Sequence, residues 1–273
     1  MDTSAAAERL VAHLTAIGPV AVAFSGGADS ALVLAAAARA NGPDAVLAVT
    51  ADSASLATAE LEGAVAFAES LGVRHVAPRT AELDNPAYAA NGRNRCYFCK
   101  STVLDTITAV ARDHGLDAVA TGVNADDAVD PFRPGIRAGD EIGVRTPLRD
   151  LGMTKAAVRA VSRHWRLSTW DKPAMPCLAS RVRYGVAITP ARLARVERAE
   201  VAVRAWLASA GTPTRDLRVR DLGDTGRVEL DPDLVDRPEI RPALTELVRA
   251  AGFDAVELAV FRSGALNHEP HRG

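Results

Sequence analysis

The chain has 273 residues, a formal net charge of −2 and 48% hydrophobic residues. This length favours one large domain with a smaller second one, and the apolar content is sufficient for a buried core. The basic residues form no strongly positive stripe, which argues against a nucleic-acid-binding surface. No apolar run approaches the about 18 residues of a membrane span, so we expect no membrane association.

The amino terminus carries acidic residues and lacks an apolar segment after a basic start, so we expect no secretory signal. The protein is therefore expected in the cytoplasm, where thiols stay reduced. In that compartment, an odd set of three cysteines favours metal binding or catalysis over a disulfide framework.

The first half of the chain alternates short apolar runs with amphipathic stretches. Strands are predicted at residues 19–24, 45–50, 73–76 and 118–121, and helices at residues 8–17, 29–40, 55–71, 96–114 and 151–165. Continuous apolar strands that alternate with helices indicate an α/β fold, a doubly wound parallel sheet covered on both faces. Ligands of such sheets bind beyond the carboxyl ends of the strands.

The pattern changes after an irregular stretch bracketed by Pro173 and Pro176. We take this stretch as the junction between two domains, residues 1–172 and 173–273. The second domain is predicted to be a smaller α+β unit, with helices at residues 189–210 and 238–251 and strands at residues 217–220, 227–230 and 255–261. A polar stretch at residues 135–141 is predicted to be a mobile loop.

Residues 25–30 (SGGADS), called the phosphate loop below, follow a predicted buried strand and open a predicted helix. Main-chain N–H groups and the helix dipole favour an anion at this point. Gly26 and Gly27 allow the backbone to approach phosphate oxygens closely, and Ser25 and Ser30 add hydroxyl donors. Asp29 suits such a site when a divalent cation, with Mg²⁺ the obvious candidate, lies between carboxylate and phosphate. A capped strand-to-helix turn without a ligand is the alternative interpretation.

SGGADS resembles the PP-loop of the N-type ATP pyrophosphatases, a superfamily that includes GMP and NAD synthetases, argininosuccinate synthetase and tRNA-modifying enzymes. The resemblance implies that ATP is split into AMP and pyrophosphate. Members adenylate an oxygen of the substrate, and a nucleophile then displaces AMP. The loop lacks the lysine of a Walker A sequence, which argues against transfer of the γ-phosphate.

The three cysteines are Cys96, Cys99 and Cys177. Cys96 and Cys99 stand three residues apart at a predicted helix start, where they share one face and where the thiol pKa is lowered. Cys177 lies near Arg181, which adds positive charge. A redox disulfide, half of a zinc site and, for Cys177, a buried apolar thiol are alternatives that the residues alone leave open.

Three longer segments carry a more specific resemblance: NGRNRCYFCK (residues 91–100), TGVNADD (121–127) and PCLASRVRYGVAITP (176–190). Together with LRVR (217–220) and RVEL (227–230), they resemble the ATP-dependent sacrificial sulfur transferases of the LarE type. This resemblance implies a role in biosynthesis of the nickel-pincer nucleotide cofactor. Family members convert carboxylates of pyridinium-3,5-biscarboxylic acid mononucleotide, a small-molecule substrate, to thiocarboxylates, and they form homo-oligomers.

The resemblance implies one of two sulfur sources. In one route, Cys177 attacks the adenylated carboxylate, gives up its sulfur and becomes dehydroalanine. In the other route, Cys96, Cys99 and Cys177 hold a 4Fe-4S cluster whose remaining iron carries a sulfide. Three thiolates and one open iron fit the second route, which we favour.

We expect the following residues of the first domain to bind ATP and Mg²⁺. The pyrophosphate and its Mg²⁺ are expected to be held by Ser25, Gly26, Gly27, Asp29 and Ser30. Thr50, at the end of the second strand, is expected beside the adenine or ribose of ATP. Asn124 and Asp126 follow the fourth strand and are candidates for nucleotide or metal contacts, although a turn cap is an equally good interpretation.

In the second domain, Arg181, Arg218 and Arg220 are candidates for binding the phosphate and carboxylates of the substrate, because guanidinium groups match such anions. Arg218 and Arg220 alternate along one strand and should share a face, which could also be a solvated one. Glu200 is a candidate acid or base, with an exposed helix position as the alternative.

Three other functions are compatible with parts of the sequence. A tRNA thiolase of the same superfamily would also use a phosphate loop and cysteines, but the net charge and the lack of a basic module argue against it. An ammonia-dependent, amide-forming synthetase would need none of the cysteines. A nucleotide-binding sensor would bind ATP without releasing AMP.

Overall fold

The computed structural model describes residues 2–127 and 135–267, and the chain divides into two compact units. The first consists of Met1–Glu82 and Cys96–Met175, and the second of Leu83–Arg95 and Pro176–Gly273. The second unit thus includes a segment, Leu83–Arg95, from the first half of the chain, which the sequence pattern did not indicate.

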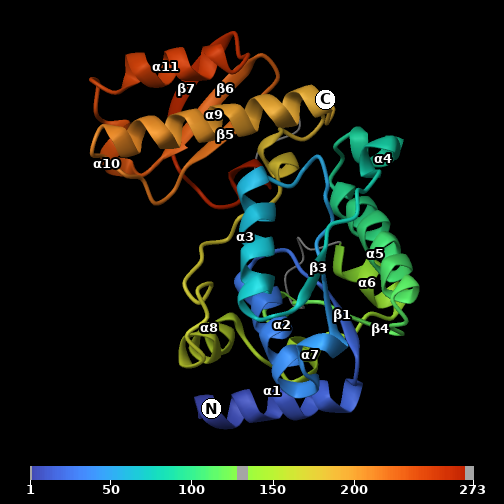
Figure 1. Cartoon of the computed structure of the whole chain (residues 1–273). Coiled ribbons are helices and arrows are strands. Elements are labelled where there is room, and N and C mark those ends of the chain that lie inside the picture. Colours follow the sequence, from blue (N-terminus) through green and yellow to red (C-terminus); the bar gives the residue numbers. More distant parts are fainter. Residues whose placement is uncertain (1, 128–134, 268–273) are drawn as a thin grey trace. The chain divides into compact units, whose positions relative to one another are not determined.

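A parallel four-stranded sheet with the strand order β3-β2-β1-β4 forms the centre of the first unit. Figure 1 labels β1, β3 and β4 of this sheet. Its strands are β1 (Val20–Ala23), β2 (Val46–Val49), β3 (Arg74–Val76) and β4 (Ala118–Ala120). Val20 of β1 pairs with Val46 on one side and with Ala118 on the other. The predicted α/β fold with a parallel sheet is therefore confirmed.

The helices up to Met175 follow the strands in an alternating order. They are α1 (Thr3–Ile17), α2 (Ala28–Asn41), α3 (Thr58–Ser70), α4 (Pro86–Ala89), α5 (Arg95–Asp113), α6 (Gly135–Ile142), α7 (Pro147–Asp150) and α8 (Lys155–His164), with 3-10 turns η1 (Pro43–Ala45) and η2 (Glu82–Asp84). No helix in the described ranges combines the length and apolar character needed to span a membrane.

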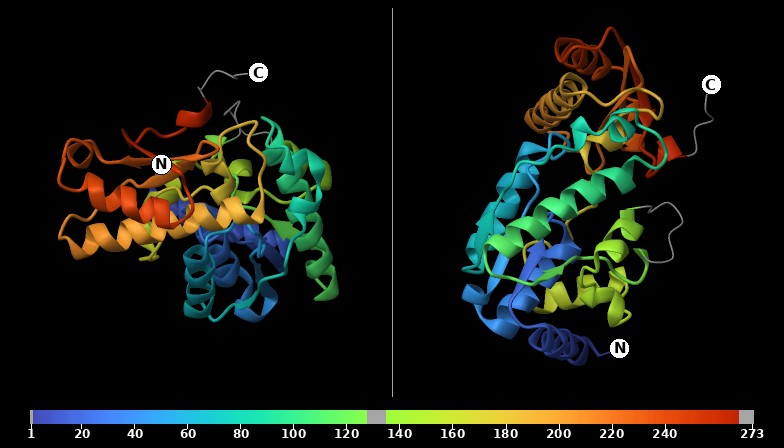
Figure 2. Two further views of the ribbon diagram at one scale, coloured as in Figure 1. Left: turned by 90° about the horizontal axis from the view of Figure 1, so that it is seen from above. Right: turned by 90° about the vertical axis from the view of Figure 1, so that its right-hand side faces the viewer.

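Helices cover both faces of this sheet (Figure 1; Figure 2). Val20 and Val22 of β1 point to the face covered by α1, α2, α3 and α8. Ala21, between them, points to the opposite face, where it packs with Ile107 and Ala111 of α5. Burial on both faces explains why β1, β2 and β4 are continuously apolar rather than alternating.

Polar capping residues determine where α1 and α8 begin, and the hydrophobic pattern of the sequence predicted these positions only approximately. Helix α1 begins earlier than predicted, because the Asp2 carboxylate accepts the main-chain N–H of Ser4 at 3.3 Å. Helix α8 begins later than predicted, because Gly152 has a φ of +63° and Thr154 caps the helix through the N–H of Ala157.

The prediction of a mobile loop at residues 135–141 is wrong, because these residues form α6. Tyr97 of α5 donates a hydrogen bond from its hydroxyl to Glu141 at 2.6 Å, and Arg149 pairs with Asp140 at 2.8 Å. Arg137 and Glu141, one turn apart on α6, form a further ion pair. A helix that is stabilised by such surface pairs has a polar sequence and resembles a loop in its composition.

The second unit has a three-stranded mixed sheet with the order β5-β6-β7. Its elements are β5 (Arg218–Asp221), β6 (Thr225–Leu230), β7 (Ala255–Val260), α9 (Pro190–Ser209), α10 (Pro232–Val235) and α11 (Arg241–Ala250), with 3-10 turns η4 (Leu178–Arg181) and η5 (Ala265–Asn267). Strands β5 and β6 are antiparallel, and β6 and β7 are parallel. Helices α9 and α11 lie side by side against this sheet (Figure 1).

A buried carboxylate joins α9 to the turn between β5 and β6. Asp221 is fully buried and forms ion pairs with Arg192 at 2.9 Å and with Arg195 at 2.7 Å. It also accepts the main-chain N–H of Gly223 at 3.0 Å. Removing this charge would leave two guanidinium groups beside a buried neutral side chain, an arrangement that is strongly destabilising.

We expect Asp221→Asn to lower the free energy of unfolding by about 3 kcal/mol, because the ion pairs are lost while the site stays buried. Urea denaturation followed by circular dichroism measures this change. Asp233→Asn is the matched control, since Asp233 is exposed and lies 3.9 Å from Arg237. The control should change the free energy by less than about 0.5 kcal/mol. Equal destabilisation by both substitutions would contradict a special role for Asp221.

Candidate functional site

The phosphate loop connects β1 to α2 through a tight turn. Gly26 has a φ of +71°, and Gly27 is the N-cap of α2. The Ser30 hydroxyl accepts the main-chain N–H of Ser25 at 3.3 Å and donates to the carbonyl of Gly27 at 3.1 Å. Ser30 thereby holds the loop in a curve around the N-terminus of α2, where main-chain N–H groups and the helix dipole favour an anion.

The strand order places the phosphate loop at the switch point of the sheet. Strand β1 lies between β2 and β4, so the chain leaves β1 toward β2 on one side and later returns to β4 on the other. The carboxyl ends of two such strands form a crevice in which ligands bind. The loop after β1 and the segment after β4 therefore line the same crevice.

Gly122, directly after β4, is where these two segments touch. A Cβ atom at this position would lie 2.6 Å from the main-chain nitrogen of Ser30 and 2.9 Å from the carbonyl carbon of Asp29. Both neighbours are backbone atoms, which no side-chain rotation can move away. Glycine is therefore required here for β4 to approach the phosphate loop so closely.

The Asp29 carboxylate joins the phosphate loop to two further segments. Asn124 donates a hydrogen bond from its amide to Asp29 Oδ1 at 3.2 Å, and the Lys155 ammonium forms an ion pair with Asp29 Oδ2. The main-chain N–H of Lys155 donates to the Asp126 carboxylate at 2.7 Å. The structure thus brings together the predicted residues Asp29, Asn124 and Asp126, and it adds Lys155.

Sequence reasoning missed Lys155, although one signal was available. The chain has 32 lysine and arginine residues, of which only Lys100, Lys155 and Lys172 are lysines. In a sequence that strongly favours arginine, a lysine indicates a position where a compact, mobile point charge is preferred to a planar fork. Both Lys155 and Lys172 contact the phosphate loop.

Asn124 and Asp126 also have the turn-capping role that was the alternative interpretation. Asn124 Oδ1 accepts the main-chain N–H groups of Asp126 at 2.9 Å and Asp127 at 3.1 Å. Asp126 in turn caps the start of α8 through Lys155. Asn124 therefore stabilises the turn with its Oδ1 atom and reaches Asp29 with its Nδ2 atom, while a contact with nucleotide or metal stays a prediction.

Thr50 lies at the carboxyl end of β2, but its hydroxyl group is engaged within the protein. It donates to the carbonyl of Phe24 at 2.7 Å and lies 2.8 Å from His75 Nε2. Because the one hydroxyl proton goes to Phe24, His75 must carry its proton on Nε2 and donate it to Thr50. Burial lowers the pKa of His75, which favours the neutral ring. A contact of Thr50 with adenine or ribose stays a prediction.

Lys172 attaches the phosphate loop to α3. Its ammonium donates to the carbonyl of Gly26 at 3.1 Å and pairs with Glu60 of α3 at 2.8 Å. A cavity of about 310 Å³ lies beside this contact; its walls include Gly26, Gly63, Phe67, Ser168, Thr169 and Lys172. The buried Thr169 hydroxyl has no hydrogen-bond partner among the described residues. Hydrogen bonds of Ser30 within the phosphate loop and the contact of Lys172 with the Gly26 carbonyl thus both hold the loop in place.

We expect Gly122→Ala to slow the formation of AMP from ATP by about 100-fold, because the added methyl group displaces the phosphate loop and misaligned reacting groups are costly. Chromatographic measurement of AMP release tests this. Gly63→Ala is the matched control, since an added Cβ there meets nothing within 4 Å. AMP release by Gly122→Ala at the rate of the control would contradict the proposed close approach.

In the second unit, Arg181 and Glu200 form a buried ion pair. Arg181 is 1% exposed, and its Nε and Nη2 atoms donate to the two Glu200 carboxylate oxygens at 3.0 and 3.2 Å. Glu200 also accepts the main-chain N–H of Val219 in β5 at 3.0 Å. The alternative interpretation of Glu200 as an exposed helix residue is therefore wrong.

The remaining guanidinium nitrogen of Arg181 holds the cysteine loop (residues 176–181). Nη1 donates to the carbonyls of Pro176 and, at 3.1 Å, Cys177, and to the Ser180 hydroxyl at 3.3 Å. The Cys177 side chain itself is exposed. Arg181 therefore fixes the backbone that carries an accessible thiol, while Glu200 neutralises the buried charge.

Arg218 and Arg220 are both 6% exposed, so a solvated strand face is the wrong interpretation for them. Arg220 pairs with Glu229 of β6 at 2.8 Å and donates to the carbonyl of Ser180 at 3.2 Å. Arg218 lies over the Phe261 ring, 5.6 Å from its centroid. Burial, followed by the charge of Arg181, lowers the pKa of Arg218.

The NGRNR part of the first cysteine motif has a structural role that the sequence did not suggest. Asn91 is fully buried with a φ of +56°, and its amide donates to the carbonyls of Val182, Arg183 and Val186 at 2.8–3.3 Å. Arg95 donates to Asn91 and lies 4.8 Å from the centre of the Tyr184 ring. These contacts order the chain that follows the cysteine loop. The sequence signal for this role was Asn91 followed by Gly92, because asparagine adopts a positive φ more readily than most other residues.

Cys96 lies in the first turn of α5 and is exposed, and Cys99 starts the second turn and is half-buried. Gly135 of α6 approaches the first turn so closely that a Cβ atom would lie 3.2 Å from the carbonyl oxygen of Cys96. Within the part of the chain that the structure describes, no three His, Cys, Asp or Glu side chains gather as a metal site. Cys96 and Cys99 belong to the first unit and Cys177 to the second, and their joint use stays a prediction.

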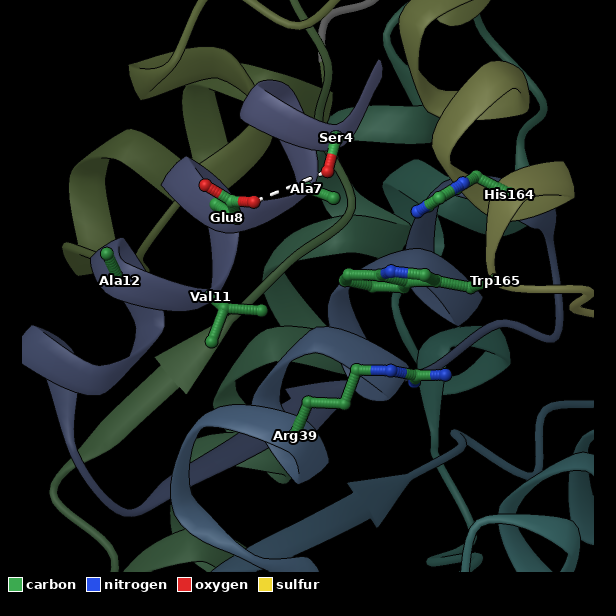
Figure 3. Close-up of a pocket in the computed structure, with 8 residues that line it drawn as sticks. All are labelled: Ser4, Ala7, Glu8, Val11, Ala12, Arg39, His164 and Trp165. Atoms are coloured by element: carbon green, nitrogen blue, oxygen red, sulfur yellow. Dashed lines mark hydrogen bonds between the residues drawn. The ribbon is translucent and has the colours of Figure 1, made fainter. Parts of the chain in front are cut away.

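A groove of about 450 Å³ lies between α1, α2 and α8 (Figure 3). In it the Arg39 guanidinium lies 4.3 Å from the centre of the Trp165 ring, opposite Glu8 and Val11. None of the predicted site residues lines this groove. Its size alone therefore does not make it the functional site.

Comparison with known proteins supports the class that the loop and sheet define. The family model described as asparagine synthase matches residues 5–88, which include the phosphate loop. Argininosuccinate synthase of Haloarcula marismortui is 32% identical over 50% of this chain and 35% of its own length. The chain is thus an ATP-dependent enzyme of the PP-loop ATP pyrophosphatase superfamily.

A more specific similarity extends over nearly the whole chain. Pyridinium-3,5-bisthiocarboxylic acid mononucleotide synthase of Lactiplantibacillus plantarum is 34% identical over 94% of this chain and 92% of its own. An uncharacterised protein of Synechocystis sp. is 43% identical over 90% of this chain and 91% of its own. The chain belongs to the LarE family, which confirms the family predicted from the motifs.

Proposed function

We propose that this enzyme converts carboxylates of pyridinium-3,5-biscarboxylic acid mononucleotide to thiocarboxylates, driven by cleavage of ATP to AMP and pyrophosphate, in nickel-pincer nucleotide biosynthesis. The observation that carries the proposal is the similarity to the bisthiocarboxylic acid mononucleotide synthase, which spans more than nine-tenths of both chains. A match of that extent includes residues of both units. The argininosuccinate synthase match covers only half of this chain and carries less weight.

The first unit would activate the substrate carboxylate. Main-chain N–H groups of the phosphate loop, the N-terminus of α2 and Ser30 would hold the outer phosphates of ATP. Mg²⁺ fits this site, because Asp29 offers a carboxylate next to the loop and Mg²⁺ is usually held by one or two carboxylates together with phosphate oxygens. A bound Mg²⁺ would neutralise charge on the phosphates while the adenylate forms.

The second unit would present the attacking sulfur. Arg181 fixes the carbonyl groups of the cysteine loop while the Cys177 thiol stays exposed. We assign Glu200 a positioning role in place of the acid–base role suggested by the sequence, because both of its oxygens accept hydrogen bonds from Arg181. A sulfur nucleophile that attacks the acyl adenylate would expel AMP, so that one difficult substitution becomes two easier steps.

The substrate carries a phosphate and two carboxylates, and the second unit offers matching charge. Arg218 and Arg220 lie on one strand close to the cysteine loop. Burial, and after it the charge of Arg181, lowers the pKa of Arg218, and a bound anion would favour its charged form. This expected effect of an anion supports the proposal that these arginines bind the substrate.

The cysteines fit a 4Fe-4S cluster by their number and chemistry. Thiolates are the ligands of such clusters, and Cys96, Cys99 and Cys177 would hold three irons and leave one open. When bound, the cluster would supply a sulfide for transfer. We favour this source over sacrifice of Cys177, since a sacrificial route requires only one of the three cysteines.

An anaerobic assay after iron–sulfide reconstitution tests the proposal. The enzyme is incubated with ATP, Mg²⁺ and the biscarboxylic acid mononucleotide, and the small molecule and the intact protein are analysed by mass spectrometry. We expect Cys96→Ala, Cys99→Ala and Cys177→Ala each to abolish thiocarboxylate formation, because each removes one cluster ligand. The matched control, Val201→Ala, changes an exposed side chain of α9 and should retain wild-type activity.

Other results of this assay would contradict either the cluster proposal or the proposed function as a whole. If only Cys177→Ala loses activity and the wild-type protein becomes lighter by H₂S, then Cys177 is the sulfur source and the cluster proposal is wrong. If a variant without all three cysteines forms an amide from ammonia, or if the wild type thiolates bulk tRNA and not the mononucleotide, the proposed function is wrong.

A further inference from the structure

The Asp29 carboxylate, our proposed ligand of Mg²⁺, is already engaged by a cation of the protein. Asp29 lies in the first turn of α2, where the helix dipole favours a negative side chain. Lys155 occupies its Oδ2 atom and Asn124 its Oδ1 atom. A metal ion that bound Asp29 directly would therefore meet the ammonium group of Lys155.

The two cations compete for one oxygen. Mg²⁺ binds oxygen ligands at about 2.1 Å, so a Mg²⁺ ion held by Asp29 Oδ2 would be close to the ammonium group of Lys155. An ammonium group and a divalent cation repel each other at such a distance. Asn124 restricts the other oxygen, because its amide is held in place by the turn at Asp126 and Asp127.

Lys155 can release Asp29 without any change in the backbone. It is the first residue of α8, its main-chain N–H is bonded to Asp126, and Thr154 caps the same helix end. The Lys155 side chain is 39% exposed and has a flexible four-carbon stem. A released ammonium group would therefore stay tethered beside the phosphate loop.

We propose that Lys155 is an exchangeable counter-ion of Asp29, which yields to Mg²⁺ when nucleotide binds and then contacts the outer phosphates. In this position Lys155 neutralises charge on the departing pyrophosphate, and it returns to Asp29 once pyrophosphate and metal have left. The inference rests on ATP dependence and on the proposed Mg²⁺ site, and it is independent of the sulfur source and of the pyridinium substrate.

A permanent structural pair between Lys155 and Asp29 is the alternative. The exposed fractions of the two side chains, 39% and 22%, argue against it, because ion pairs that water reaches contribute little to stability. An exchangeable pair and a permanent pair also differ in what removal of the lysine does. Removal of a competitor strengthens metal binding, whereas removal of a structural partner weakens the whole site.

Lys155→Met separates the two cases, with Mn²⁺ as a spectroscopic substitute for Mg²⁺. We expect Mn²⁺ alone, followed by electron paramagnetic resonance, to bind the variant about threefold more tightly than the wild type, because the competing ion pair is gone. Inorganic pyrophosphate with Mn²⁺, followed by calorimetry, should bind about tenfold more weakly, because a charged hydrogen bond is lost. Opposite changes in the two affinities support the exchange.

Arg159→Met is the matched control, because it removes the same charge from an exposed position one turn further along α8. It should change both affinities by less than about twofold. The exchange is refuted if Lys155→Met weakens both affinities together, if it leaves either unchanged, or if neither protein binds Mn²⁺. These measurements contain no pyridinium substrate, so failure of the sulfur-transfer proposal would leave their result unaffected.

A second measurement uses the wild-type protein and does not depend on a variant that folds. Acetylation by acetic anhydride, quantified by mass spectrometry, reports the exposure of each lysine amine, and the exposed Lys100 serves as the internal reference. Saturation with Mn²⁺ should raise the reactivity of Lys155, and addition of pyrophosphate should lower it again. Unchanged reactivity of Lys155 relative to Lys100 would refute the exchange.

Discussion

The close approach of Gly122 to the backbone of the phosphate loop is the constraint on which the candidate nucleotide site depends. It brings the end of β4 against the first turn of α2, at the switch point of the sheet. Asn124 can then reach Asp29, and Asp126 can hold the first residue of α8, Lys155. Because Gly122 has no side chain, Asn124 and Lys155, which are far from Asp29 in the sequence, can both contact the Asp29 carboxylate.

In the first unit, the absence of a side chain at Gly122 positions the phosphate loop. In the second unit, the buried Arg181 positions the cysteine loop. Arg181 has every guanidinium nitrogen engaged, by Glu200 on one side and by the carbonyls of the cysteine loop on the other. A planar fork suits a fixed backbone, whereas the lysine beside the phosphate loop suits a partner that can change. The choice between the two cations therefore agrees with a fixed backbone in the cysteine loop and with the exchange that we propose at Asp29.

The sequence predicted the parallel sheet and the phosphate loop, because continuous apolar strands and a glycine-rich strand-to-helix turn are local signals. It identified the family through the cysteine motifs. It did not reveal that Lys155 contacts Asp29, since 126 residues separate them. The burial of Glu200 and Arg218 was also hidden, because helix and strand patterns show charge but not the partner that neutralises it. Helix α6 was missed because surface ion pairs stabilise it.

The return of Leu83–Arg95 to the second unit has a consequence for how the protein can be divided. The chain passes between the units after Glu82, after Arg95 and after Met175, so a single cut cannot separate them. A fragment that ends near residue 172 would keep Asn91 but lose the three carbonyl groups that its amide satisfies. The second unit therefore starts within the first half of the chain and is complete only after the segment from Pro176 onward has been synthesised, whereas every residue of the first unit is in place once Met175 has been added.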